Sequence, residues 1–170
     1  MKSGVKNTLV LVAICAVMAL LLAVTNYITA PVIAKNQEAA TEKALQQVMP
    51  EGRDFVAVEL VEGLPATVTE VYRESGGGYV LKLKTAGYGA DFIIMCGVDQ
   101  NGTVTGAVCL SSNETLGEEK AFGERFVGVN GADVTAVDTV AGATKTTAAY
   151  RAAVADAVAA AEMLRTMAEG

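Results

Sequence analysis

The residues most able to do chemistry lie in the segment Asp-Thr-Val-Ala-Gly-Ala-Thr at positions 138–144. Gly142 permits a close approach of the backbone to a ligand, and Thr144 brings a hydroxyl to the start of a predicted helix. The unpaired N–H groups and the dipole at such a helix start favour a phosphate. Among the neighbours, Ala143 adds a backbone amide, Lys145 adds a positive charge, and Thr146 and Thr147 add hydroxyl donors. The segment therefore predicts an anion site at a junction between a strand and a helix.

An ordinary capped helix after a strand is the alternative interpretation of the same residues. The chain is rich in Gly, Ala and Thr, so a Gly-Ala-Thr tripeptide is weak evidence by itself. Asp138, six residues before Thr144, makes the pattern more specific. This aspartate is expected either to orient the threonine loop or to serve only as a turn former.

The composition excludes several classes of chemistry. The chain has 170 residues, of which 52% are hydrophobic and 19% charged, and this excludes a disordered chain. Because it has no His, it has neither a Ser-His-Asp triad nor a His-rich zinc site, and its three Cys argue against a disulfide scaffold. A net charge of −6 and the absence of Trp argue against nucleic acid as a partner.

Residues 8–28 form an almost wholly apolar run without Asp, Glu, Lys or Arg. About 20 helical residues span about 30 Å, the thickness of the hydrocarbon core of a bilayer. We predict a transmembrane helix over 8–28, with a cleaved secretory signal as the alternative. Lys2 and Lys6 precede the run, whereas residues 35–170 carry 11 Lys and Arg against 19 Asp and Glu. The positive-inside rule then predicts a single-pass protein of the cell membrane with residues 1–7 in the cytoplasm and the later domain outside it.

Beyond the apolar run, a helical stalk is predicted at 29–52, followed by five short runs rich in β-branched residues. These runs lie at 55–58, 66–72, 78–84, 92–98 and 103–110 and predict an antiparallel sheet. Asn101-Gly102 between the last two runs is typical of a hairpin turn. A turn centred there places Cys96 opposite Ala107, so Cys96 and Cys109 are diagonal neighbours. Two buried, reduced thiols are predicted, with a distorted disulfide as the alternative.

Three helices accompany this sheet in the prediction. One continues from the apolar run through 35–48, a short one lies around 119–126, and an amphipathic one covers 148–167 with Thr146 or Thr147 as its N-cap. The β-branched residues from Val134 onward predict a strand that leads into the last helix. The predicted fold class is α+β, with an extracytoplasmic domain at 53–170 whose antiparallel sheet is flanked by helices.

With these elements placed, the segment 138–144 resembles Asp-x-x-(Ser/Thr)-Gly-Ala-Thr, the recognition motif for covalent flavinylation. A membrane-anchored domain with this motif near its carboxyl end is similar to the FMN-binding G subunits of Rnf electron-transport complexes and to the homologous C subunits of the sodium-pumping NADH:quinone reductase. The length of the chain favours the Rnf family. The other segments that carry the resemblance are 24–31, 44–50, Gly87-Tyr88-Gly89, Val98-Asp99 and Asn113-Glu114-Thr115.

Two positions depart from the family pattern. Ala141 stands where the family has Ser or Thr. The family's Glu-Thr-Pro-Gly-Leu-Gly loop over the flavin is here Glu114-Thr115-Leu116-Gly117, without the proline. The loop contacts are therefore less securely implied than those of Thr144.

The resemblance implies that FMN is attached covalently to Thr144. A flavin transferase with Mg²⁺ would use FAD as donor: the threonine oxygen bonds to phosphorus, the anhydride bond breaks, and AMP leaves. The product is a phosphoester whose isoalloxazine ring is chemically unchanged. The residues implied near the ring are Glu114, Thr115, Leu116, Gly117 and Tyr88, and those implied near the phosphate are Gly142, Ala143, Lys145, Thr146 and Thr147.

The functional hypothesis that follows is an electron relay within an ion-translocating ferredoxin:NAD oxidoreductase, and not a stand-alone catalyst. The implied partners are the other membrane subunits of the Rnf-type complex, the flavin transferase during maturation, and the membrane. Two alternatives stay open: an anchored sensor or assembly module without flavin, and a stand-alone extracytoplasmic flavin carrier.

Overall fold

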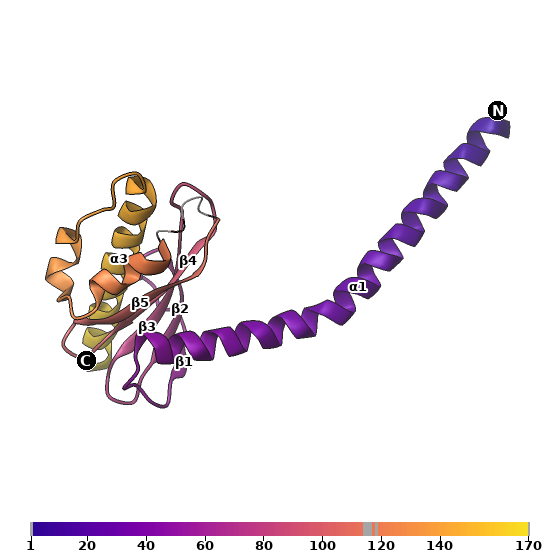
Figure 1. The fold of residues 1–170 in the computed structure, drawn as a ribbon. Helices are drawn as coiled ribbons and strands as arrows, with labels where there is room; N and C mark the ends of the chain where they lie inside the picture. The colour runs from indigo at the N-terminus through magenta and orange to yellow at the C-terminus, as the bar shows by residue number, and fades with distance from the viewer. Residues whose placement is uncertain (1, 114–116, 118, 170) are drawn as a thin grey trace. The chain divides into compact units, whose positions relative to one another are not determined.

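Residues 2–48 form one long helix, and the later part of the chain builds a sheet with helices packed against it (Figure 1). The computed structural model describes residues 2–113, 117 and 119–169, with only the backbone given at 2–5, 34 and 169. Its contacts divide the chain into two units, residues 1–41 and 42–170. The two units are described separately below.

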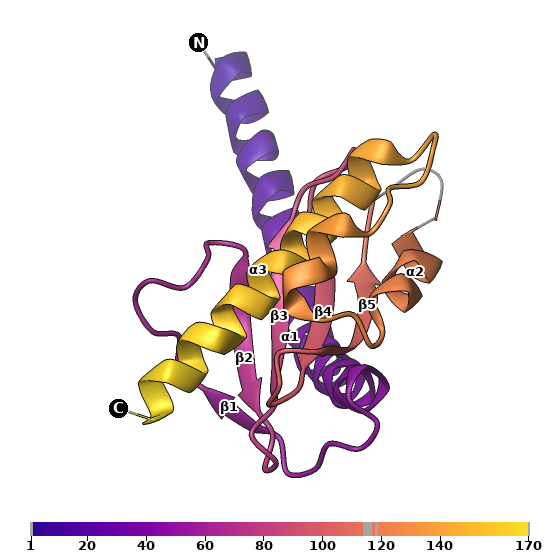
Figure 2. The ribbon, with the colours of Figure 1, turned by 90° about the vertical axis from the view of Figure 1, so that its left-hand side faces the viewer.

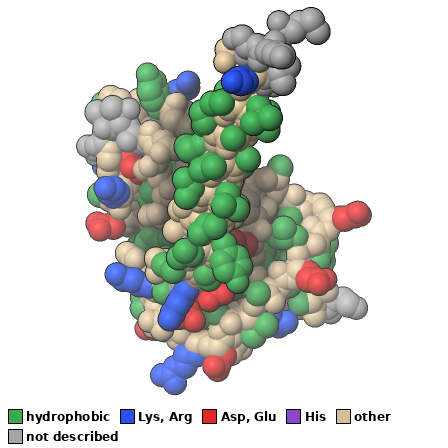
Figure 3. All heavy atoms as spheres, turned by 90° about the vertical axis from the view of Figure 1, so that its right-hand side faces the viewer, with side chains coloured by type: hydrophobic (Ala, Val, Ile, Leu, Met, Phe, Trp, Pro, Cys, Tyr) green, Lys and Arg blue, Asp and Glu red, His purple; other side chains and the backbone are tan. Residues whose placement is uncertain are grey.

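Most of the helix α1 (Lys2–Val48) belongs to the first unit. The large apolar side chains of α1 between Leu9 and Ile33 are exposed, and Figure 3 shows hydrophobic side chains along the visible face of the helix. The hydroxyls of Thr25 and Thr29 donate to the carbonyls of Leu21 and Thr25, four residues back, so they are satisfied without water. Among the described residues this is the one helix long and apolar enough to cross a membrane, a test that a signal sequence also passes. The predicted apolar helix is confirmed, and it continues without interruption past Pro31 into the predicted stalk.

The second unit is built on a five-stranded antiparallel meander. Its strands are β1 (Val56–Val58), β2 (Val68–Arg73), β3 (Tyr79–Thr85), β4 (Phe92–Val98) and β5 (Val104–Ser111), paired in sequence order. All five predicted strands are confirmed within two residues at each end. Cys96 pairs with Ala107 as the turn at Asn101-Gly102 predicts, and both Cys96 and Cys109 are free thiols.

Alternation along the strands gives the sheet two buried faces. One face, with Leu81, Leu83 and Ile94, packs against the long helix α3 (Thr144–Glu169), which crosses the sheet in Figure 2. The other face, with Val80 and Met95, is covered by the last two turns of α1, which belong to the second unit. The predicted α+β class, an antiparallel sheet flanked by helices, is confirmed.

The connection between β5 and α3 contains short helices and no strand in the part that the structure describes. These are α2 (Glu119–Phe122) and two 3₁₀-helices, η1 (Gly123–Phe126) and η2 (Gly131–Ala136). The helix predicted around 119–126 is confirmed, but the strand predicted from Val134 is wrong. Val134, Val137 and Val140, spaced by three, pack against the core from a 3₁₀-helix and an extended segment. A strand there would need an open sheet edge, and η1 packs beside the outer edge of β5.

Candidate functional site

The first turn of α3 lies at one particular end of the sheet. The Tyr150 ring meets Phe92, the first residue of β4, edge-on with centroids 5.6 Å apart. Near the other end of α3, the Arg165 guanidinium reaches the carbonyl of Asp99, just after β4. The helix therefore runs alongside β4, and its first residues lie where β3 ends, β4 begins and β5 ends (Figure 2).

A compact set of hydrogen bonds fixes the turn before α3. The buried Thr147 hydroxyl donates to the Ala143 carbonyl at 2.9 Å and accepts the Val140 N–H at 3.1 Å. Gly142 adopts a φ of +87°, a conformation that favours glycine. The helix begins at Thr144, so the predicted N-cap at Thr146 or Thr147 is wrong. Thr147 instead lies in the first turn of the helix, and its hydroxyl accepts a hydrogen bond from the Val140 N–H of the preceding segment.

Thr144 is the exposed hydroxyl at this helix start. Its Oγ1 makes one long contact, 3.4 Å, to the Val140 carbonyl. The first backbone bond across the helix start joins the Thr147 N–H to Ala143, so the earlier amides of Thr144 and Lys145 have no acceptor within the helix. Lys145 is also exposed, whereas Thr146 is buried. An accessible hydroxyl beside helix-start amides and a lysine is an arrangement able to hold an anion such as a phosphate.

Two arginines hold the extended segment that precedes this turn. Arg151 donates to the Val137 carbonyl at 2.9 Å, and Arg125 donates to the Asp138 carbonyl at 3.4 Å. The Arg125 guanidinium also lies 5.5 Å from the centre of the Phe122 ring. The Asp138 side chain is exposed, so the motif aspartate lies on the surface of the segment and outside the core.

The loop between β3 and β4 lies at the same end of the sheet and contacts the end of β5. The Asn113 side chain donates to the Ala90 carbonyl at 3.2 Å. A Cβ on Gly89 would lie 2.7 Å from the backbone carbonyl oxygen of Asn113. Tyr88 in this loop is 75% exposed. Three of the predicted ring contacts, Glu114, Thr115 and Leu116, lie outside the described residues. Gly117 is described and has a φ of +73°.

Next to Ser112, just after β5, the structure places a buried carboxyl group that the sequence analysis missed. Glu119 is 2% exposed, and its Oε1 accepts the Ser112 hydroxyl at 2.6 Å. The Glu119 Oε2 and the Tyr150 hydroxyl have no hydrogen-bond partner in the part of the chain that the structure describes. Burial raises the pKa of the nearby Cys109 thiol, and the Glu119 charge adds to this rise. A glutamate beside a second glutamate and a lysine has the sequence pattern of a surface residue, so no local signal marks Glu119 as buried.

Two family comparisons cover most of the chain. Residues 1–48 match the RnfG N-terminal region, and residues 87–159 match the FMN-binding domain. The second match runs from the Tyr88 loop through the start of α3, so it includes every described residue of the predicted site. The chain carries an RnfG N-terminal region and an FMN-binding domain. The family recognised from the motifs is thereby confirmed.

A curated relative gives the same result. This RnfG-type chain is 35% identical, over 127 residues, to the G subunit of the Na(+)-translocating ferredoxin:NAD(+) oxidoreductase complex of Acetobacterium woodii. The alignment covers 66% of this chain and 61% of the relative. The RnfG-type chain thus spans about three fifths of the length of the curated relative it matches.

Proposed function

We propose that this protein carries FMN in a phosphoester bond to Thr144 and relays electrons within an ion-translocating ferredoxin:NAD oxidoreductase complex. The observation that carries the proposal is the exposed Thr144 hydroxyl at the start of α3, inside the segment that matches the FMN-binding domain. When bound, FMN supplies the one- and two-electron redox chemistry.

The residues around Thr144 have distinct tasks in this proposal. The amides of the first turn of α3 and the Lys145 ammonium stabilise the phosphate charge. Gly142 gives the backbone its turn, and Thr147 keeps the turn in register with the helix. Tyr88 and Gly117, with Glu114, Thr115 and Leu116, are proposed to border the isoalloxazine ring. A flavin transferase is the proposed partner in maturation.

The apolar part of α1 is proposed to anchor the domain in the membrane beside other subunits. Residues 1–7 would lie in the cytoplasm, residues 8–28 would span the bilayer, residues 29–52 would lead out of it, and residues 53–170 would lie on the opposite side. Small residues along one stretch of α1, among them Ala13, Ala16 and Ala19, permit close packing against other helices. Covalent attachment would suit a domain outside the cytoplasm, where lost FMN could not be replaced from a pool.

The intact mass of the purified chain, produced together with a flavin transferase, tests the attachment. The wild type is expected to show one FMN adduct, Thr144→Ser is expected to retain it in part, and Thr144→Ala is expected to lose it. Thr139→Ala, which changes a nearby threonine outside the helix start, is the matched control and should keep the adduct. A wild-type chain of unmodified mass would contradict the proposal.

One observation favours a second candidate, an anchored module without flavin. The loop that starts at Glu114 lacks the proline of the family pattern and departs from it after Thr115. A colourless protein without flavin fluorescence, after production with the transferase, would support this candidate. If flavin is present but no other integral subunit co-purifies, the stand-alone electron carrier is favoured.

A further inference from the structure

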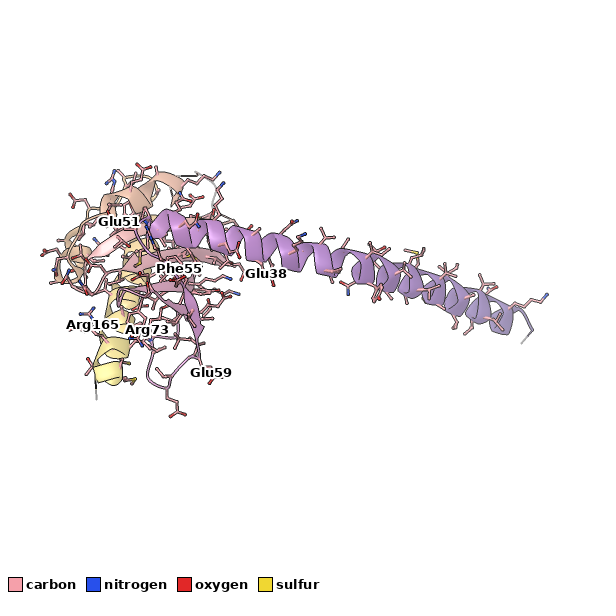
Figure 4. All side chains as sticks on the ribbon, turned by 90° about the horizontal axis from the view of Figure 1, so that it is seen from below. Glu38, Glu51, Phe55, Glu59, Arg73 and Arg165 are labelled. Atoms are coloured by element: carbon pink, nitrogen blue, oxygen red, sulfur yellow. The ribbon has the colours of Figure 1, made fainter. Side chains whose placement is uncertain are left out.

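A polar groove lies at the end of the sheet opposite Thr144, where β2 and α3 end. Its volume is about 480 Å³, and the turn between β4 and β5 forms one wall. Arg73, the last residue of β2, and Arg165, in the last part of α3, both line it. Figure 4 labels the two side chains in this part of the second unit.

Neither arginine forms an ion pair with a carboxylate of the described residues. The two ion pairs there join Lys82 to Glu70 and Lys84 to Asp91. Arg165 has one long contact, 3.5 Å from its Nη2 to the Asp99 carbonyl, and its Nε is buried with no hydrogen-bond partner among those residues. A buried charged donor without an acceptor is costly, so the described residues leave the Arg165 guanidinium poorly satisfied.

Two carboxylates next to the groove along the chain, those of Asp99 and Glu74, accept hydrogen bonds from turn amides. The Asp99 carboxylate accepts the N–H groups of Asn101 and Thr103, each at 2.8 Å. The Glu74 carboxylate accepts the N–H of Gly76 at 2.6 Å. No Asp or Glu is among the described residues that line the groove, whereas Gln100 and Asn101 add side-chain amides. Within its described lining, the groove therefore offers two positive charges and neutral donors without a carboxylate.

We infer that this groove binds a small dianionic oxyanion, for which inorganic phosphate is the simplest probe. Two guanidinium groups match two negative charges, and the planar fork of each can donate two parallel N–H bonds to a pair of oxygens. The groove has room for such an ion. Because residues 35–170 carry a net negative charge, an anionic lipid surface is a poor source of this group. The inference does not depend on the attachment of FMN.

Titration of the full chain in detergent micelles, followed by the Nε–Hε NMR signals of its five arginines, tests the inference. At constant ionic strength, adding phosphate in place of chloride is expected to shift the Arg73 and Arg165 signals along one saturating curve. The signals of Arg125 and Arg151, which lie beside the Thr144 segment, report separately on any phosphate bound there. Succinate as a second probe distinguishes a carboxylate-binding groove from one that selects a tetrahedral ion.

Substitutions make the test specific. Arg73→Gln is expected to weaken phosphate binding about tenfold, as expected for the loss of one charged hydrogen bond. Arg165→Lys keeps the charge but removes the fork, and is expected to weaken binding by a similar factor while the Arg73 signal still reports it. Arg53→Gln, an exposed arginine outside the groove, is the matched control and should leave binding unchanged. The inference is overturned if neither probe gives saturable shifts at Arg73 and Arg165, or if Arg53 shifts to the same extent.

Discussion

The Thr105 hydroxyl donates a 2.6 Å hydrogen bond to the carbonyl of Val48, the last residue of α1. This bond joins the end of the helix to the face of β5. On either side of it, Gly97 and Gly106 let the sheet approach the helix backbone: a Cβ on Gly106 would lie 2.7 Å from the Val48 Cα, and a Cβ on Gly97 2.8 Å from the Val48 carbonyl oxygen. The end of α1 is thus fixed to the sheet through backbone contact.

Replacing Gly106 with alanine should weaken this docking. The added methyl must displace backbone atoms of Val48, so we expect a loss of about 1–3 kcal/mol in the free energy of unfolding, measured by urea denaturation with near-UV circular dichroism. Thr105→Val should cost about 1 kcal/mol, because it leaves the Val48 carbonyl without its donor. Thr69→Val, which removes an exposed hydroxyl bonded to the Lys82 carbonyl at 3.0 Å, is the control and should have a smaller effect. Equal losses for Thr105→Val and Thr69→Val would contradict the special role of the Val48 contact.

Loss of the Thr147 hydroxyl should loosen the segment that presents Thr144. In Thr147→Val the Val140 N–H loses its acceptor, and we expect the free energy of unfolding to fall by about 1–2 kcal/mol. Thr147→Ser keeps both hydrogen bonds and should stay close to the wild type. If Thr144 is the site of FMN attachment, Thr147→Val should also lower the fraction of flavinylated chains in the mass spectrum. Unchanged stability in Thr147→Val would show that the two bonds contribute little.

The hydroxyl of Tyr150 should contribute nothing favourable to stability. The Tyr150 ring packs against Phe92, Phe122 and Phe126, but its hydroxyl is buried without a partner among the described residues. Tyr150→Phe should therefore leave the free energy of unfolding unchanged or raise it by about 1 kcal/mol. Tyr150→Leu loses the ring contacts and should cost at least about 1 kcal/mol. A clear loss in Tyr150→Phe, measured by thermal unfolding, would reveal an acceptor for the hydroxyl.

The buried thiol of Cys96 predicts a loss of stability at high pH. Complete burial raises the pKa of this thiol from 9.0 to about 12, so the folded protein keeps the proton where the unfolded chain loses it. The contribution is intact below pH 9 and falls as the pH rises toward 12, by about 2 kcal/mol at pH 10.5. Urea unfolding at pH 8 and pH 10.5 measures the fall, which should be smaller by that amount in Cys96→Val. An equal fall in both proteins would assign the loss of stability to other groups. Tyr72 is one such group, because burial and the hydrogen bond to Glu70 raise its pKa to about 12.

The sequence alone determined most of the elements of this protein and placed Thr144 at a helix start. The apolar run, the five β-branched runs and the amphipathic last helix each depend on local periodicity. The prediction located all of them, although the last helix begins four residues earlier than predicted. The position of Thr144 at a helix start follows from the residues around it, as does the pairing of Cys96 with Ala107 across a short turn. Features of this kind depend only on contacts between neighbours in the sequence or across one hairpin.

Only the tertiary structure decided what lies between β5 and α3 and which polar groups are buried. Val134 and its neighbours have strand propensity, but they cannot pair with β5 because η1 packs beside that strand. They pack against the core as a 3₁₀-helix and an extended segment instead. Glu119 and Arg165 look like surface residues in the sequence, yet packing buries the Glu119 side chain and the Arg165 Nε. Burial is a property of the packed chain, because it depends on which distant segments exclude water. The local sequence pattern around a residue does not specify those segments.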